Sequence, residues 1–288
     1  MAYDLGRFGA FQRKDRATPQ LATALEEAGY GALWVGGSPG VDDVPQLGAL
    51  LGATSRLVVA TGIVNVWKDD AADIAAAVRP LVERYPDRFL LGIGVGHPEA
   101  SGERYASPYA ALVAYLDALD AAGIGAGHRA LAALGPRVLG LAGARTAAAH
   151  PYLVPVEHTR RARQLLGDGV LLAPEHKAVL DQDPERARTL ARPAVATPYL
   201  SLVNYTSNLR RLGYTDEDLA AGGSDRLVDD LVATGDAARV ATLLGGHLDA
   251  GADHVAVHLL VPAGGDPVPA LVEGYRQLAP QLGLKKEA

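Results

Sequence analysis

A glycine-rich segment that ends in histidine is the first feature of this sequence that could do chemistry. Residues 92–96 read Gly-Ile-Gly-Val-Gly, and His97 follows directly. Glycine has no Cβ, so backbone there can approach a flat ligand closely, although close strand packing uses glycine in the same way. Histidine exchanges a proton near neutral pH. The segment therefore has two interpretations, close strand packing or a ligand ring against the backbone, and the place of His97 directly after a predicted strand favours a functional histidine.

Two other segments have the form of helix starts, where free backbone N–H groups can meet an anion. Gly135 and Pro136 open one expected helix, and His158 and Thr159 follow Glu157 at the start of another. These residues are equally typical of plain helix caps. The other interpretation is that both segments hold an anionic part of a ligand, with Thr159 donating its hydroxyl.

Neither metal nor thiol chemistry finds support. The chain has no cysteine, which excludes disulfides, thiolate metal sites, iron–sulfur clusters and a cysteine nucleophile. His254 and His258 have a zinc spacing only if they lie on a helix, but the residues around them predict a strand. No metal site is therefore predicted, and redox chemistry would need a bound organic cofactor.

Charge and hydropathy indicate which kinds of molecule this protein binds. The chain carries 27 Lys and Arg against 33 Asp and Glu, a net charge of −6, with no basic block that would suggest nucleic acid. The apolar runs are far shorter than a membrane span and the first residues lack a signal pattern, so a cytoplasmic protein is expected. The expected partner is a small-molecule substrate, and the oligomeric state stays open, a homodimer included.

Eight short apolar runs, most followed by a helical pattern, must position these residues. A parallel strand that helices cover on both faces is apolar along its length. Eight such units in about 250 residues are typical of a (β/α)8 TIM barrel, an α/β fold whose chemistry lies in the loops after the strands. The runs are residues 3–10, 32–35, 57–64, 89–95, 129–133, 147–153, 170–173 and 254–260.

The helical patterns complete a single domain. Starts such as Thr18-Pro19 and Asp183-Pro184 place proline at the first helical position. The patterns at 193–212, 215–220 and 225–233 predict inserted helices between the seventh and eighth strands, within one domain of residues 1–288. The others cover 18–28, 44–53, 71–84, 108–122, 136–145, 157–166, 183–190 and 236–251.

Three stretches resemble the luciferase-like flavin and deazaflavin superfamily, and specifically its branch that uses coenzyme F420. The first is GYGALWVGGS at 29–38; the second is ATGIVNVW at 60–67 with RYPDRFLLGIGVGHP at 84–98. The third is LGPR at 134–137, with HPYL at 150–153 and EHT at 157–159. The resemblance runs over most of the chain in the order of the family's strands, and it implies one luciferase-like TIM-barrel domain.

The resemblance also implies a cofactor site. Family members have a non-proline cis peptide behind the deazaflavin ring, and the matching bond is that between Gly62 and Ile63. The cofactor-binding residues that it implies are Gly62, Ile63, Asn65, Gly94, Gly96, His97, Gly135, Pro136, His158 and Thr159.

The implied activity is that of an F420-dependent oxidoreductase, which transfers a hydride between C5 of the deazaflavin and an unidentified small organic substrate. His97 would move the proton, with Ser38 and Asn65 as the next catalytic candidates. Relatives that act on sugar phosphates have Asp-His where this chain has Gly37-Ser38, which argues against sugar oxidation. Two alternatives remain open: an FMN-dependent luciferase-like monooxygenase, and a barrel that binds F420 or flavin without catalysis.

Overall fold

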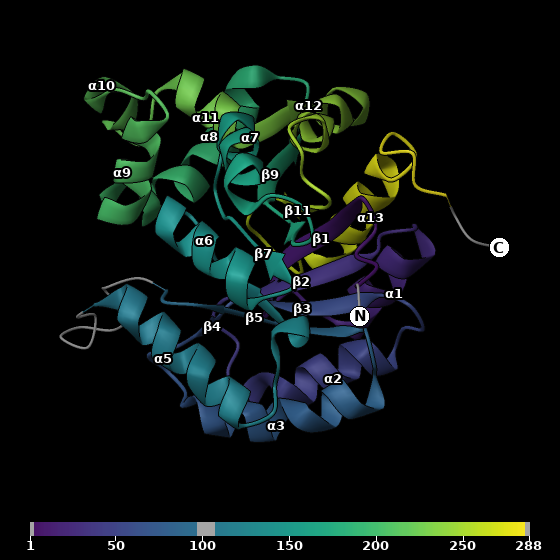
Figure 1. Cartoon of the computed structure of the whole chain (residues 1–288). Helices are drawn as coiled ribbons and strands as arrows, with labels where there is room; N and C mark the ends of the chain where they lie inside the picture. The colour runs from purple at the N-terminus through teal and green to yellow at the C-terminus, as the bar shows by residue number, and fades with distance from the viewer. Residues whose placement is uncertain (1–2, 97–106, 286–288) are drawn as a thin grey trace.

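Parallel strands form one sheet that curls through the middle of the molecule (Figure 1). The computed structural model describes residues 3–96 and 107–285. The sheet order is β10-β9-β11-β1-β2-β3-β5-β6-β7-β8, with β4 paired to β5. The strands are β1 (Phe8–Arg13), β2 (Ala32–Gly36), β3 (Val58–Gly62), β4 (Val64–Asn65), β5 (Phe89–Gly94), β6 (Arg129–Leu131), β7 (Ala148–Ala149), β8 (Leu171–Leu172), β9 (Glu175–Leu180), β10 (Val232–Gly235) and β11 (Val255–Leu259).

Helices surround the strands, with α2, α3 and α5 on one side and α8 to α12 on the other (Figure 1). The expected caps are present: the Thr18 hydroxyl accepts from Leu21 N at 3.2 Å, and Asp183 caps α8. The helices are α1 (Pro19–Glu27), α2 (Val44–Gly52), α3 (Ala71–Arg84), α5 (Pro108–Ala121), α6 (Pro136–Arg145), α7 (Val156–Leu166), α8 (Pro184–Ala196), α9 (Val203–Arg211), α10 (Asp216–Leu219), α11 (Asp225–Leu231), α12 (Ala237–Asp249) and α13 (Val268–Leu278).

Backbone hydrogen bonds connect the segment of β8 and β9 to the strands on both sides. Ala173 N donates to Ala149 O at 2.9 Å beside β7, and Asp253 N donates to Leu172 O at 2.9 Å before β11. β9 then pairs with β11 and with β10. The sheet is therefore strongly curved, and its strand ends converge on one mouth.

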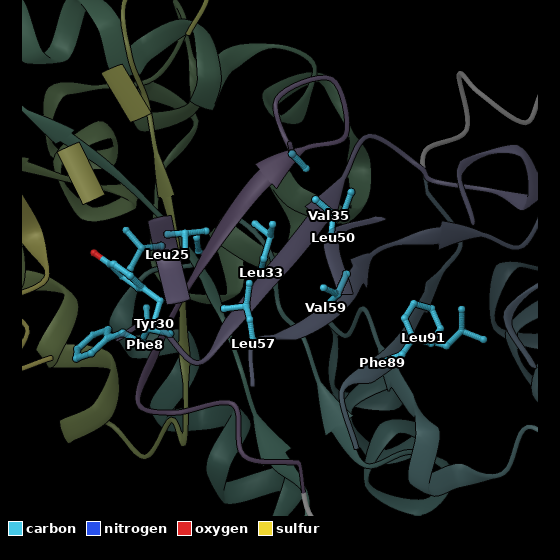
Figure 2. Close-up of a cluster of buried hydrophobic side chains, with 14 of the residues drawn as sticks. Phe8, Leu25, Tyr30, Leu33, Val35, Leu50, Leu57, Val59, Phe89 and Leu91 are labelled. Atoms are coloured by element: carbon cyan, nitrogen blue, oxygen red, sulfur yellow. The ribbon is translucent and has the colours of Figure 1, made fainter. Parts of the chain in front are cut away.

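Alternate residues of each strand face the helices and the inside of the curved sheet, as the twofold repeat of a strand requires. Leu33 and Val35 of β2 pack with Val59 of β3 toward the helices, together with Leu25 of α1 and Leu50 of α2 (Figure 2). Both sets of residues are buried, which explains why the strands read as continuous apolar runs rather than as alternating ones.

The buried cluster inside the curved sheet includes a tryptophan. Trp34 is fully buried there among small residues of the neighbouring strands, and its Nε1 donates to His254 Nε2 at 3.1 Å. His150 stacks on the indole, with ring centroids 4.0 Å apart. The small residues that surround it are Ala32, Ala60, Ala130, Ala148, Ala173 and Ala256.

Five features of the fold differ from the sequence-based prediction. The first strand is Phe8–Arg13 rather than residues 3–10, and the strand expected at 170–173 is reduced to Leu171–Leu172. The strand Glu175–Leu180 was not predicted, because its charged residues break the apolar pattern. Residues Val232–Gly235 form β10, whereas a helix was expected through residue 233, and the helix Val268–Leu278 was not predicted.

Several histidines are buried without charge. His247 Nε2 lies 2.9 Å from His176 Nδ1, and Thr159 Oγ1 lies 2.7 Å from His247 Nδ1. Burial lowers the pKa of His150, of His176 and of His254 to about 4, well below the ordinary value of 6.5. At neutral pH these rings are therefore neutral and act as structural hydrogen-bonding groups.

These pKa values predict a loss of stability in mild acid. Between pH 6.5 and 4 the unfolded chain binds protons at His150, His176 and His254 that the folded chain does not, so stability is complete above pH 6.5 and falls below it. Because one pKa unit corresponds to about 1.4 kcal/mol per group, we expect the free energy of unfolding to fall by about 3 kcal/mol or more from pH 7.5 to 5.5. Urea unfolding at the two pH values measures this difference. Equal stability at both would contradict it, and His254→Gln should reduce the pH dependence.

Candidate functional site

A cavity of about 820 Å³ opens where the carboxyl ends of the strands converge. In barrels of parallel strands this is the end that carries chemistry. The lining includes residues that follow β2, β5, β6 and β7, such as Ser38, Gly96, Leu134 and Tyr152. Residues of α9, among them Tyr205, close another side. Helix α9 thus forms a wall of the cavity.

A bulge after β3 forms part of the floor. The peptide bond between Gly62 and Ile63 is cis, as the resemblance implied, and both residues line the cavity. A Cβ on Gly62 would stand 2.8 Å from Phe11 Cε2 and 3.6 Å from His150 Nε2, so glycine leaves room for those two rings. Gly94 lies beneath the bulge, since its own Cβ would stand 3.0 Å from Ile63 Cδ1.

His150 brings an unpaired acceptor to the floor beside Gly62. Its Nδ1 lies 2.6 Å from Ala173 O, and because a carbonyl only accepts, Nδ1 carries the hydrogen. Its Nε2 is buried without a hydrogen-bond partner among the described residues. A buried nitrogen without a partner lowers the stability of the fold unless a ligand or a water molecule donates a hydrogen bond to it.

The described residues of the lining carry positive charge but no carboxylate. Arg13 at the end of β1 and Arg16 after it lie on one wall, and Arg137 and Arg211 lie near the start of α6 on another. The Arg137 guanidinium lies over the Tyr109 ring, 4.3 Å from its centroid. A Cβ on Gly135 would stand 3.8 Å from a guanidinium nitrogen of Arg211. An anionic ligand group is therefore favoured at the start of α6, where backbone N–H groups and two cations meet.

A buried charged cluster lies on β9 and β11. Glu175 Oε1 accepts from Lys177 Nζ at 2.8 Å and from His258 Nδ1 at 2.8 Å, while Glu175 Oε2 accepts from Leu153 N at 3.0 Å. Lys177 and His258 line the cavity, whereas Glu175 is buried behind them. Lys177 Nζ also lies 4.1 Å from the centre of the Tyr152 ring. A carboxylate thus fixes two cavity-facing side chains.

Burial and charge set the protonation of this cluster. Burial alone would raise the pKa of Glu175, but Lys177 and His258 outweigh it and hold the pKa of that carboxyl well below its usual range. Burial lowers the pKa of His258, and the hydrogen bond to Glu175 only partly opposes this effect. At neutral pH Glu175 is therefore ionised and His258 is neutral.

The structure brings together six of the residues expected to form the site. Gly94 supports the bulge from below, and the lining does not include Pro136. His158 Nε2 lies 2.8 Å from Leu134 O, which holds the loop after β6, and the Thr159 hydroxyl is engaged with His247. His97 lies outside the described residues. The six that line the cavity are Ser38, Gly62, Ile63, Asn65, Gly96 and Gly135.

Local geometry explains two of these positions. Gly96 has φ +59°, and the Asn65 amide occupies the place where a side chain would point, so glycine is required there. Ser38 also has a left-handed φ of +51°, within the sequence Gly-Gly-Ser-Pro-Gly at 36–40. This spacing occurs around the nucleophilic serine of hydrolases, but none of the described hydrogen bonds joins Ser38 to a histidine. Ser38 is therefore a polar residue of the cavity lining.

Sequence reasoning missed Glu175, Lys177 and the role of His258. The only signal was the run Glu-His-Lys at 175–177 between apolar segments, which by itself is typical of a solvent-exposed turn.

Within the described parts of the chain, no helix is long and apolar enough to cross a membrane. The same residues contain no cluster of three or more His, Asp or Glu side chains that could hold a metal ion.

Comparison with known proteins confirms the resemblance to the luciferase-like superfamily for the first part of the chain. Residues 9–123 match the family model of the luciferase-like monooxygenases. An F420-dependent secondary alcohol dehydrogenase, solved with an F420-acetone adduct, superposes with a TM-score of 0.73 at 14% identity, over 98% of this chain and 99% of that one. The F420-dependent tetrahydromethanopterin reductase from Methanopyrus kandleri gives 0.69 at 15% identity, over 97% and 99%.

A third similar structure binds a different cofactor. The oxygenating constituent of 3,6-diketocamphane monooxygenase from Pseudomonas putida, in complex with FMN, superposes with a TM-score of 0.68 at 14% identity, over 96% of this chain and 94% of that one. No match was found among curated proteins. At these identities the structural likeness shows the fold alone.

Proposed function

Because residues 9–123 match the luciferase-like monooxygenases, we propose that this chain is an F420-dependent oxidoreductase that transfers a hydride between the deazaflavin and a small organic substrate. In this proposal the curved sheet is a (β/α)8 barrel, with α8 to α11 inserted before its last strand. The observation that carries the proposal is the cavity, where the Gly62–Ile63 bulge and a cationic helix start lie in one site.

The residues present fit such a cofactor. Gly62, Ile63 and Gly96 offer backbone and apolar contacts for a flat ring. His150 Nε2, beside Gly62, has no hydrogen-bond partner among the described residues, and a donor on the polar edge of the ring could be that partner. Gly135, with Arg137 and Arg211, would hold the anionic phosphate and glutamyl tail. When bound, the deazaflavin supplies hydride transfer at C5. Ser38, Asn65 and His97 remain the proposed polar contacts around the ring and the substrate.

FMN is the alternative occupant, since it also combines a flat ring with an anionic phosphate. Measuring the dissociation constants of F420 and of FMN with the purified protein separates the two cofactors. Tighter binding of FMN, together with oxygen-dependent turnover, would replace the proposal by a monooxygenase. Binding of F420 without hydride exchange on any substrate would leave a non-catalytic carrier.

The cationic helix start predicts a salt-dependent affinity for F420. Its tail is anionic, so the dissociation constant should rise several-fold between about 20 and 200 mM salt, because exposed charges are then screened. The uncharged deazaflavin core without its tail should respond little. The Arg211→Gln variant should bind F420 more weakly and with a smaller salt dependence, whereas Arg226→Gln, outside this cavity, should match the wild type. An equal salt response of F420 and of the core would exclude this tail site.

A further inference from the structure

The orientation of His258 has a chemical consequence. The ionised Glu175 carboxylate only accepts hydrogen bonds, so the His258 nitrogen that contacts it at 2.8 Å, Nδ1, carries the hydrogen. In the neutral ring the other nitrogen, Nε2, then has a lone pair and no hydrogen. Because His258 lines the cavity, Nε2 is the nitrogen that remains for a ligand. The buried carboxylate also stabilises the imidazolium that forms when Nε2 takes up a proton.

His258 lies on the same floor as the bulge. The Phe11 ring contacts His258, with ring centroids 4.8 Å apart, and it also lies against Gly62. A ligand whose ring rests on the bulge therefore has His258 one aromatic side chain away. The charged groups around the imidazole are Glu175 and Lys177 on β9 and Arg16 after β1. Tyr152 after β7 lies against Phe11 and under the Lys177 ammonium. Tyr152 is uncharged, since burial raises its pKa well above 10.

We infer that Glu175 and His258 form a proton-accepting dyad, in which Nε2 accepts a hydrogen bond from a hydroxyl group of the substrate and then its proton. The inference rests on the proposed function, because the deazaflavin proposed there is the oxidant of the substrate. The substrate O–H bond breaks and an N–H bond forms at Nε2, while the electron pair left on oxygen makes the C=O bond. A bound oxidised deazaflavin would take the hydride released from the same carbon. His258 is then the catalytic residue, and Glu175 positions it.

Binding of two matched probes tests the dyad without cofactor or turnover. At pH 7.5 the neutral Nε2 should favour cyclohexanol, which donates a hydrogen bond, over cyclohexanone by about 3- to 10-fold, the usual effect of one such bond. Below the pKa of His258 the imidazolium donates a hydrogen bond to the oxygen of either probe, so the preference for cyclohexanol should disappear. His258→Gln should abolish this change with pH, whereas His254→Gln, on the same segment but outside the cavity lining, should retain it. A preference that does not change with pH in the wild type would overturn the inference.

The charges around His258 allow a second test by histidine-selective NMR. Lys177 lowers the pKa of His258 and Glu175 raises it, so Lys177→Met should move the titration of His258 to higher pH. The double variant Glu175→Gln/Lys177→Met, which leaves no unpaired buried charge, should titrate at lower pH than Lys177→Met alone. A His258 titration that neither variant moves would exclude coupling between the groups. This readout does not require the His258 variant to fold.

Turnover separates failure of the dyad from failure of the proposed function. If the protein reduces F420 with an alcohol, His258→Gln should lower kcat/KM by about 10²- to 10⁴-fold and remove the acidic limb from its pH profile, where protonation of His258 stops it from accepting a proton. A variant with near-normal turnover, or a larger loss in His97→Ala, would overturn the assignment of the proton to His258. If F420 is not turned over while the probe preference is still lost at low pH, the dyad stands and the cofactor proposal fails.

Discussion

Glu175→Gln should lower the free energy of unfolding by about 3–5 kcal/mol, which is the usual cost of removing one partner from a buried ion pair. The carboxylate is fully buried and accepts hydrogen bonds from Lys177, from His258 and from Leu153 N. Glutamine keeps an acceptor for Leu153 N but leaves the Lys177 ammonium, only 1% exposed, without its counter-charge. Urea unfolding at pH 7.5 measures the loss.

The matched control removes both charges. The double variant Glu175→Gln/Lys177→Met has similar side-chain volumes, and we expect it to recover most of the lost stability, because replacing a whole buried pair is often nearly neutral. Cofactor affinity and probe binding can then be measured on a folded protein. A loss below about 1 kcal/mol in Glu175→Gln alone would show that water or structural relaxation already screens Lys177.

Gly62→Val should raise the dissociation constant of F420 at least about 10-fold, a cost of roughly 1.4 kcal/mol or more. A side chain at this position would meet Phe11 at 2.8 Å and would occupy the floor on which we place the ring. Titration of the cofactor, followed by its fluorescence, measures the effect. The far-ultraviolet circular dichroism of the variant should be unchanged.

Gly36→Val is the control for this variant. A Cβ on Gly36 would also press on the Phe11 ring, at 2.5 Å from Cζ, but Gly36 is not part of the cavity lining. We therefore expect a clearly smaller loss of affinity from Gly36→Val. Equal losses in the two variants would mean that displacement of Phe11, rather than a blocked floor, weakens binding. An unchanged affinity in Gly62→Val would remove the bulge from the site.

The sequence could predict those parts of the fold that depend on continuous apolar patterns. The strands Ala32–Gly36 and Phe89–Gly94 and the helices around them lie close to where the patterns placed them, because both faces of these strands are buried. Glu175–Leu180 could not be predicted in the same way. Its charged side chains are buried only because they pair with each other and with His258, a residue 83 positions further along the chain.

The candidate site was predictable to a similar extent. Gly96 was predicted from a glycine-rich strand end, a pattern that is local in sequence, whereas Gly62 and Ile63 were predicted from the resemblance of residues 60–67 to the family. Thr159 reads as a helix-start donor, yet its hydroxyl contacts His247 in the interior, because only the packing of α7 against α12 decides which way it points. His258 reads as a strand histidine until Glu175 is seen behind it.

The distribution of charge also bears on how quickly ligands arrive. The chain as a whole is acidic, with a net charge of −6, whereas the described cavity lining bears arginines and no carboxylate. An anion approaching a random point of the surface is repelled, but one that reaches the mouth is drawn inward by field lines that the low-dielectric walls concentrate. The association rate for anionic ligands is therefore governed by the mouth rather than by net charge. Added salt weakens the attraction of anions at the mouth, which lowers the association rate. It also weakens their repulsion by the rest of the surface, which raises the association rate, so the two effects oppose each other.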